Sequence, residues 1–248
     1  MDWALRSGLY CAKGIVEKGN ATPALTFTLD VNDVAVEATF DDECAKLPLN
    51  DVLNDEGEPD PVIEPALKSL FSQQLGPDRA NLLMDQLRDW IDPDSAGAFE
   101  SNAPNRPFLH LQEFLNLPAL TSNPLPPEAA TLLPGLITVW SDGKVNVNTA
   151  PEPVLRAILP HLSDDTIAEV LEHRDLIPFS QSSDLEAVIG TFPGALPQKI
   201  SFTSNVFTVN LTARSNSAVK RAEGVISMIG DEEPLARITM WRTWWPET

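Results

Sequence analysis

The sequence predicts an α+β protein in which a large all-α domain is inserted into a small domain made of one helix and an antiparallel sheet. An amphipathic helical pattern opens the chain, and segments that alternate as strands do follow it and return near the C-terminus. Helical periodicity with proline-rich connections fills the middle. Strands interrupted by a helical block and then completed indicate one discontinuous domain. We therefore place the α+β domain at 1–58 and 200–248 and the inserted domain at 59–199.

The first element is a helix over residues 2–18, which ends at Gly19-Asn20. Its apolar stripe is longer than one face of a small domain needs. We therefore expect part of the stripe to contact helices of partner proteins, through Leu5, Leu9, Ala12 and Val16.

Five segments have the alternation of strands. Residues 24–30 and 33–40 alternate on either side of Val31-Asn32, as in a hairpin, and three more segments follow at 202–214, 218–230 and 235–245. The last segment is crowded with Trp241, Trp244 and Trp245. Since successive strand residues face opposite sides, we expect at least one of these indoles near the surface.

The most informative stretch runs from Lys144 to Gly190. Asn148 or Thr149 can cap a helix that Pro151 opens and that stops before Pro160. Ser163 then starts a second helix and Ser182 a third. This segment resembles the helix-hairpin-helix module of DNA-binding proteins, in which a glycine-rich turn offers backbone amides to phosphate.

The charge pattern opposes that use. The turn at 160–163 has no glycine, and Asp164 and Asp165, which are typical of helix capping, follow it where a phosphate would bind. The chain carries 36 acidic and 17 basic residues, a formal charge of -19, which opposes nucleic-acid affinity. We expect no nucleic-acid partner, with a helix-hairpin-helix nucleic-acid-binding protein such as a DNA-uptake factor as the alternative.

The helical domain contains two short segments of similar sequence, which we call the sequence echo. Pro107-Phe108 is followed by Glu113-Phe114, and Pro178-Phe179 is followed at the same offset by Asp184-Leu185. Two related half-units packed together would explain the echo. Two independent helices that start at proline would explain it equally well.

Five motifs follow one another along the chain: DWALRSGLYCAKGIVEKG, DDECAKLPLN, LLMDQLRDWIDPDSAGAFES, NRPFLHLQEFLNL and VNVNTAPEPVL. Together, and in this order, they resemble the general secretion pathway protein K family, the large minor pseudopilin of the type II secretion system. The resemblance covers most of the chain. It implies a pilin-like α+β domain with an inserted helical domain.

The resemblance also implies a function, which is to prime or cap the pseudopilus at its tip during export of folded proteins across the outer membrane. The implied partners are other minor pseudopilins in a hetero-oligomeric tip complex, with the major pseudopilin below. The family has a membrane-spanning N-terminal half-helix, and no apolar run here approaches that length. We expect a soluble fragment in which Met1 replaces that segment, from a protein on the periplasmic side of the inner membrane.

The candidate sites are few. The three histidines lack metal-ligand spacing and no nucleophile motif is present, so we expect no enzyme. Oxygen ligands on a glycine-containing loop suit calcium, which the family is reported to bind, and the candidates are Asp89, Asp92, Asp94 and Glu100. A solvated acidic loop is the alternative.

The only cysteines are Cys11 and Cys44. A periplasmic location, as the family resemblance implies, would favour a disulfide between them. Two buried thiols remain the alternative.

Overall fold

The computed structural model describes residues 1–248 except 94–96, 100–102, 193, 217, 231–234 and 247–248. The chain divides into unit 1, residues 1–44 with 204–248, and unit 2, residues 45–203. We expected the insertion to start at 59. It starts earlier because Leu47, Leu49 and Val52 are buried in the core of unit 2. The predicted α+β class, an N-terminal helix and antiparallel sheet with inserted helices, is confirmed.

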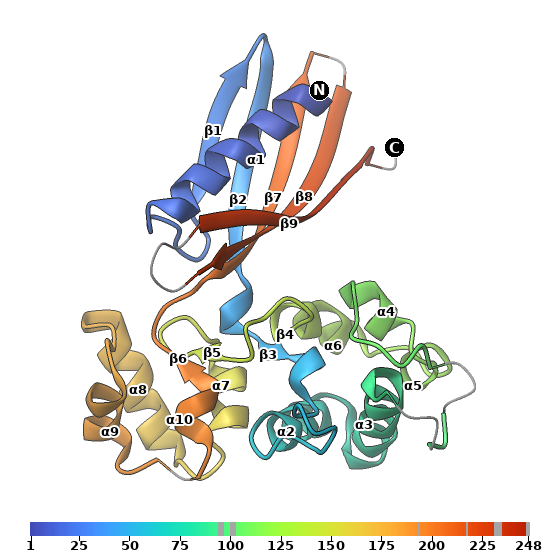
Figure 1. Ribbon diagram of the computed structural model, residues 1–248, viewed down its shortest axis with the longest axis vertical. Coiled ribbons are helices and arrows are strands. Elements are labelled where there is room, and N and C mark those ends of the chain that lie inside the picture. The colour runs from blue at the N-terminus through green and yellow to red at the C-terminus, as the bar shows by residue number, and fades with distance from the viewer. Residues whose placement is uncertain (94–96, 100–102, 193, 217, 231–234, 247–248) are drawn as a thin grey trace. The chain divides into compact units, whose positions relative to one another are not determined.

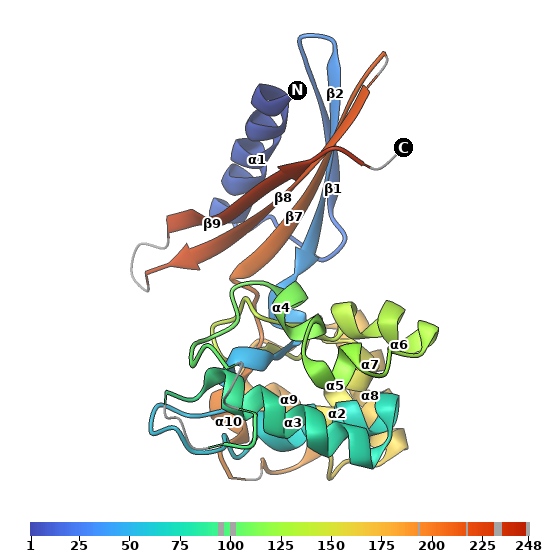
Figure 2. The same ribbon diagram turned by 90° about the vertical axis from the view of Figure 1, so that its right-hand side faces the viewer.

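Unit 1 is one helix lying across one face of a five-stranded antiparallel sheet of order β1-β2-β7-β8-β9 (Figures 1 and 2). The sheet joins an early hairpin to the three strands that close the chain, so the fold is complete only after unit 2 has been made. Its elements are α1 (Asp2–Glu17), β1 (Thr26–Val31), β2 (Val34–Asp42), β7 (Val206–Ser215), β8 (Ala218–Ile229) and β9 (Leu235–Trp244).

The helix is held on the sheet by apolar side chains from both sides. Every second residue of β2 from Val34 to Phe40 is buried, which is the pattern of a strand with one covered face. Gly8 and Gly224 let the layers approach closely. A Cβ at Gly8 would lie 2.6 Å from Leu211 Cδ2, and one at Gly224 would lie 2.5 Å from Leu9 Cδ1.

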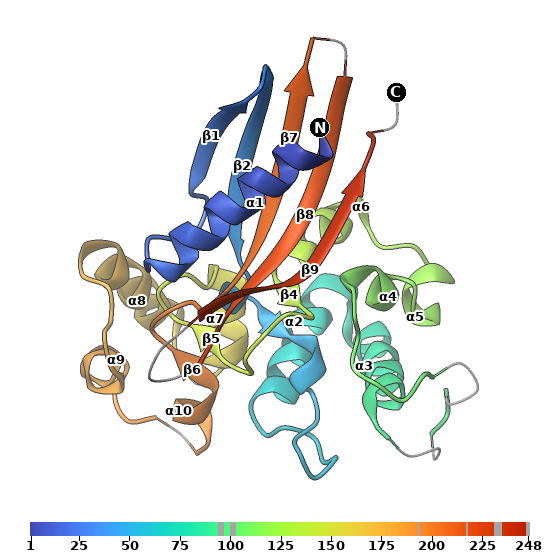
Figure 3. The ribbon, with the colours of Figure 1, turned by 45° about the horizontal axis from the view of Figure 1, so that its top comes forward.

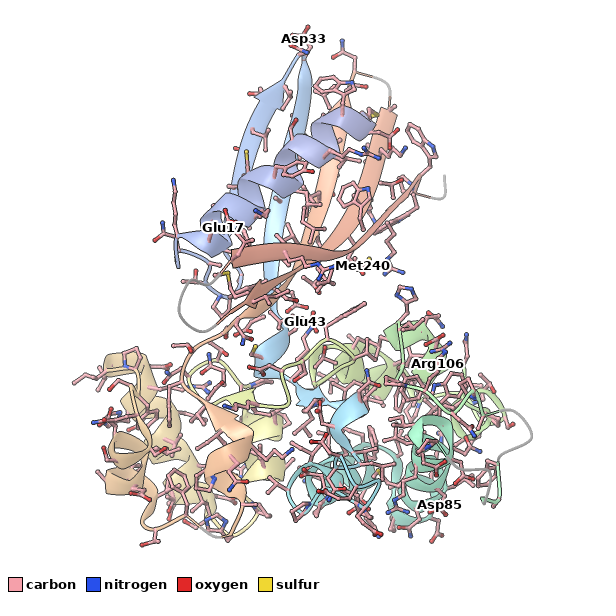
Figure 4. All side chains as sticks on the ribbon, viewed as in Figure 1. Glu17, Asp33, Glu43, Asp85, Arg106 and Met240 are labelled. Carbon is pink, nitrogen blue, oxygen red and sulfur yellow. The ribbon has the colours of Figure 1, made fainter. Side chains whose placement is uncertain are left out.

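A two-residue turn closes the β1-β2 hairpin. Val31 pairs with Val34, and Asn32 and Asp33 have φ of 45° and 63°. Positive φ at both central positions matches the twist of a hairpin, and Asn and Asp tolerate it. Figure 4 shows Asp33 at the tip of this hairpin and Glu17 near the C-terminal end of α1. The turn lies one residue later than the sequence indicated.

Unit 2 is helical, with two short parallel strand pairs, β3-β4 and β5-β6. Its helices are α2 (Ile63–Leu75), α3 (Pro77–Ile91), α4 (Leu111–Leu115), α5 (Pro118–Thr121), α6 (Pro127–Leu132), α7 (Glu152–Ile158), α8 (Asp164–Leu176), α9 (Ser182–Ile189) and α10 (Leu196–Lys199). Its strands are β3 (Leu47–Pro48), β4 (Ile137–Thr138), β5 (Val145–Asn146) and β6 (Ile200–Ser201), and 3-10 turns cover 43–45, 49–51 and 133–135.

Unit 2 consists of two halves built on one plan, which we call the first half (45–143) and the second half (144–203). In the first half, Asn50 Nδ2 donates to the Phe108 and Val139 carbonyls, both at 3.0 Å, and Asn50 Oδ1 accepts from Phe108 N at 2.8 Å. In the second half, Asn148 makes the same three bonds, to the Phe179 and Phe202 carbonyls at 2.8 and 2.9 Å and from Phe179 N at 2.9 Å.

The strand registers agree with this equivalence. Asn50 follows Leu47 by three residues, and Leu47 pairs with Ile137, two residues before Val139. Asn148 follows Val145 by three residues, and Val145 pairs with Ile200, two residues before Phe202. The equal offsets mean that each asparagine joins the equivalent strand pair of its own half to the backbone around a phenylalanine. We call this arrangement the asparagine clamp.

Two further contacts repeat. The clamped phenylalanines are buried and each stacks on a ring from the preceding long helix, Trp90 on Phe108 at 4.8 Å and His173 on Phe179 at 4.7 Å between centroids. Five residues after each phenylalanine, a carboxylate accepts the N–H that follows that phenylalanine. The sequence echo is therefore confirmed as a structural repeat.

Asn148 is consequently not a helix cap. The residue that precedes α7 is Pro151, and no side chain caps that helix. The predicted start at Ser163 is confirmed, since its hydroxyl accepts from Thr166 N at 3.2 Å, and α9 starts at Ser182 behind a Gln181-Asp184 capping box.

Candidate interaction surface

The four residues expected to contact partners lie in the core of unit 1. Leu5 and Ala12 are fully buried, and Leu9 and Val16 are 3% exposed. All four pack on the chain's own sheet. The expectation is corrected, because the stripe that looked too long for one small domain is covered by a sheet of five long strands.

The opposite face of α1 is the accessible one. Trp3 and Tyr10, two turns apart, are 44% and 66% exposed. Cys11 is exposed beside them, and the small residues Ser7 and Gly14 are half-buried on the same side of the helix. Large rings separated by small residues suit close packing against another helix.

Charged groups fix the N-terminal end of α1 to the sheet. Lys220 Nζ donates to Asp2 Oδ1 at 2.5 Å, and this hydrogen bond lowers the pKa of Asp2. The same ammonium lies 4.9 Å from the centroid of the Trp245 ring. The expectation of a surface indole is confirmed, since Trp244 and Trp245 are 38% and 59% exposed.

The two cysteines are not joined. Cys11 is exposed on α1, whereas Cys44 is fully buried beyond the end of β2 and its Sγ donates to Asn205 Oδ1 at 3.2 Å. The expected Cys11–Cys44 disulfide is therefore corrected. Cys11 belongs to the solvent face of α1 and Cys44 packs beneath the first residues of the returning chain.

Of the four expected calcium ligands, Asp94 and Glu100 lie outside the described residues. Asp89 Oδ2 accepts from Phe99 N at 2.7 Å, so this carboxylate holds Phe99 close to the end of α3. Within the described part of the chain, no three His, Cys, Asp or Glu side chains gather as metal ligands. Asp89 and Asp92 therefore form no complete calcium site by themselves.

The acidic start of α8, directly after the helix-hairpin-helix turn, is paired with an arginine of the chain itself. Arg156 pairs with Glu152 at 2.7 Å and also with Asp164 at the start of α8. Arg174 donates to the Val147 and Ala150 carbonyls at 2.8 and 2.6 Å, and its burial lowers its pKa. These arginines are used inside unit 2, which leaves the turn poorly suited to phosphate.

The geometry defines a class of protein, a pilin-like helix-on-sheet domain interrupted by a duplicated helical unit. Residues 145–202, which span most of the second half of unit 2, match the family model of type II secretion system (T2SS), protein K. A search of curated proteins finds no significant match.

A solved structure shares the fold of almost the whole chain. It is a chain in the crystal structure of the GspK-GspI-GspJ complex from the type 2 secretion system of enterotoxigenic Escherichia coli. The two are 16% identical and superpose with a TM-score of 0.73, over 98% of this chain and 95% of that chain. This likeness shows a shared fold, and it agrees with the family match over residues 145–202. The resemblance seen in the sequence is thereby confirmed.

Among the described residues, none of the helices has the length and apolar character needed to cross a membrane.

Proposed function

We propose that this protein is a structural minor pseudopilin at the tip of the type II secretion pseudopilus, where it primes or caps assembly for export of folded proteins across the outer membrane. The observation that carries the proposal is the interrupted helix-on-sheet fold, shared with a chain of the GspK-GspI-GspJ complex over nearly its whole length. In this proposal, the large helical insertion formed by residues 45–203 is the feature that would prevent a further subunit from being added above this one.

The proposed partners are other minor pseudopilins, with the major pseudopilin below them. Support comes from the exposed face of α1, where Trp3 and Tyr10 offer apolar area that the chain's own sheet does not cover. We place the full-length protein on the periplasmic side of the inner membrane, anchored by an N-terminal segment. In this role the protein is a structural component and not an enzyme.

Secretion in cells tests the proposal. A strain that lacks its own copy of the corresponding gene should regain export of its type II substrates when the full-length protein is supplied. Trp3→Asp together with Tyr10→Asp should reduce export strongly. Leu176→Asp, at a side chain 83% exposed on unit 2, is the matched control and should restore export fully. Normal export by the double variant would show that the outer face of α1 does not bind partners. A failure of the wild type to restore export would refute the proposed function.

Calcium binding at the acidic loop after α3 is a second part of the proposal. It is supported by carboxylates clustered in sequence around Asp92 and by the Asp89 bond that holds Phe99 close to the end of α3. Calcium added after chelation should raise the thermal midpoint, because a ligand that binds only the folded state stabilises it. Asp92→Asn with Asp94→Asn should abolish the rise, while Asp85→Asn, on the exposed face of α3, should keep it. A flat wild-type titration would refute the site.

A further inference from the structure

One border of the sheet in unit 1 is open along its backbone. β9 is the last strand in the sheet order and pairs with β8 alone, and Figure 3 shows its C-terminal half at the right-hand border of the sheet. The register of β9 shifts midway along the strand. Before the shift Ala236 is 1% exposed, whereas every residue from 242 to 245 is exposed. We call the open stretch 240–245 the β9 edge, and Figure 4 labels Met240, where it begins.

The alternation of the strands shows which backbone groups point outward at the β9 edge. Met228 N donates to the Asn205 carbonyl at 2.7 Å, so the even-numbered residues of β8 bond to β7 and the odd-numbered ones bond to β9. Beyond the register shift, the β9 residues opposite those odd-numbered residues have even numbers. The N–H and C=O groups of Trp241 and Thr243 therefore point away from the sheet. Within the described parts of the chain, no other segment bonds to them.

The spacing of these groups selects an extended strand as the occupant. They recur at every second residue, about 7 Å apart, and another extended backbone presents N–H and C=O groups at the same interval. Sheets commonly protect such borders with short strands, lysine or proline. β1, at the opposite border, has 6 residues, whereas β9 has 10, and the β9 edge contains neither lysine nor proline. The β9 edge thus lacks these three forms of protection.

The side chains beside the β9 edge favour an acidic and partly apolar strand. Trp244 and Trp245 are 38% and 59% exposed, so a strand laid against them would cover indole surface. Arg242 Nη2 bonds to Glu223 at 2.8 Å, yet the arginine side chain stays 53% exposed. Because a guanidinium has several donors, Arg242 can hold a second carboxylate from the outer side. Arg221, opposite Trp244 on β8, is also exposed, and the β9 edge has no acidic residue.

We propose that the β9 edge binds an extended acidic segment of another protein, which adds to the sheet as a further strand. A carboxylate of that strand faces Arg242, and its apolar side chains lie on Trp244 and Trp245. Hydrogen bonds to the backbone of Trp241 and Thr243 supply affinity, and the side-chain contacts supply selectivity. A second copy of this chain is disfavoured as the occupant, because paired β9 edges would bring two copies of Arg242 close together. This inference does not rest on the proposed function.

The test removes one outward donor with proline. The probe is a fluorescent synthetic peptide of about seven residues that alternates valine and threonine around one glutamate. Thr243→Pro removes an outward N–H but no hydrogen bond to β8, and it should weaken peptide binding about tenfold or more.

The matched control is Thr28→Pro, at an exposed threonine of β1. Phe40 N donates to the Leu25 carbonyl, so the odd-numbered residues of β1 bond to β2 and the N–H of Thr28 also points outward. This variant should bind the peptide within about twofold of wild type, because only the donor at the opposite border is lost. Thermal melts check that both variants are folded.

Three further measurements separate strand addition from loose adsorption. N-methylation of every second peptide amide should abolish binding, because it removes the hydrogen bonds of the added strand. Lysine in place of the peptide's glutamate should weaken binding, and Arg242→Gln should remove that preference. The amides of Trp241 and Thr243 should exchange more slowly with deuterium when the peptide is bound, as measured by NMR.

Each outcome has a distinct meaning. Absence of wild-type binding at peptide concentrations up to about 1 mM overturns the inference. Equal affinities of the two proline variants, or unchanged binding of the N-methylated peptide, also overturn it. A wild-type dimer that Thr243→Pro dissociates in sedimentation assigns the β9 edge to a second copy of this chain and overturns the inference as well. The export assay tests the proposed function separately from all of these results.

Discussion

At the scale of single residues, Asn50 and Asn148 organise unit 2. Each amide joins a strand pair to the backbone on both sides of a buried phenylalanine. Asn148→Ala would leave three backbone groups without partners and should lower the free energy of unfolding by roughly 3 kcal/mol in urea titrations. Asn116→Ala, at an exposed position on the surface of unit 2, should change it by less than about 0.5 kcal/mol. Equal stabilities of these two variants would show that the hydrogen bonds of Asn148 do not stabilise unit 2.

A pair of carboxylates makes unit 2 sensitive to acid. Hydrogen bonds from Arg106 lower the pKa of Glu113 to about 2, and hydrogen bonds from Ser180 lower that of Asp184 to about 2. Because both folded pKa values lie below the unfolded ones, their stabilisation is complete above about pH 4.5 and is lost as the pH falls toward 2. Glu113→Gln with Asp184→Asn should flatten that part of the stability curve, measured as thermal midpoint from pH 6 to pH 2.5. An unchanged acid slope would contradict this assignment.

The residue roles that the sequence failed to predict are those that depend on partners far away in the chain. Asn148 looks like a helix cap because it stands just before Pro151, yet its partners lie 31 and 54 residues away. The Cys11–Cys44 pair and the apolar stripe of α1 failed for the same reason. No local pattern shows that a returning strand covers one side of α1 or that Asn205 lies beside Cys44.

At the scale of elements, α1 packs closely on the sheet at two glycines, Gly8 and Gly224. Gly8→Val should destabilise unit 1 by about 1–3 kcal/mol, because its side chain would overlap buried Leu211. Gly14→Ala, on the same helix with nothing within 4 Å of the added carbon, should be neutral or more stable by up to about 1 kcal/mol. Thermal or urea unfolding measures both. If Gly14→Ala lowered the stability as much as Gly8→Val, the effect would come from the helix itself and not from its contact with the sheet.

Long elements were predictable from the sequence and short ones were not. The periodicities at 2–18, 24–40 and 202–245 placed α1, both hairpin strands and the three closing strands, with ends displaced by a few residues. β3, β4, β5 and β6 have two residues each. Two residues show no period, so the parallel pairs that define the repeat appear only in the structure. In the sequence, the only sign of this repeat that we recognised was the similarity between the segments around Phe108 and Phe179.

At the scale of the whole molecule, the negative charge is concentrated in unit 2. Residues 45–203 contain 23 acidic and 9 basic side chains. This charge and the Arg156–Asp164 pair lead us to expect no binding to duplex DNA even at low salt, where attraction would be strongest. Asp164→Asn with Asp165→Asn should gain none. Micromolar, salt-sensitive binding in a fluorescence anisotropy titration would favour the nucleic-acid alternative.

The central claim is that this chain is a subunit of a minor pseudopilin complex, and the mass of a reconstituted complex tests it most directly. We would mix the protein with the soluble periplasmic parts of the other minor pseudopilins of the same system and measure mass by sedimentation equilibrium. The expected result is a stable hetero-oligomer that contains one copy of this chain. Sedimentation of every component as its own monomer, at concentrations up to tens of micromolar, would contradict the account.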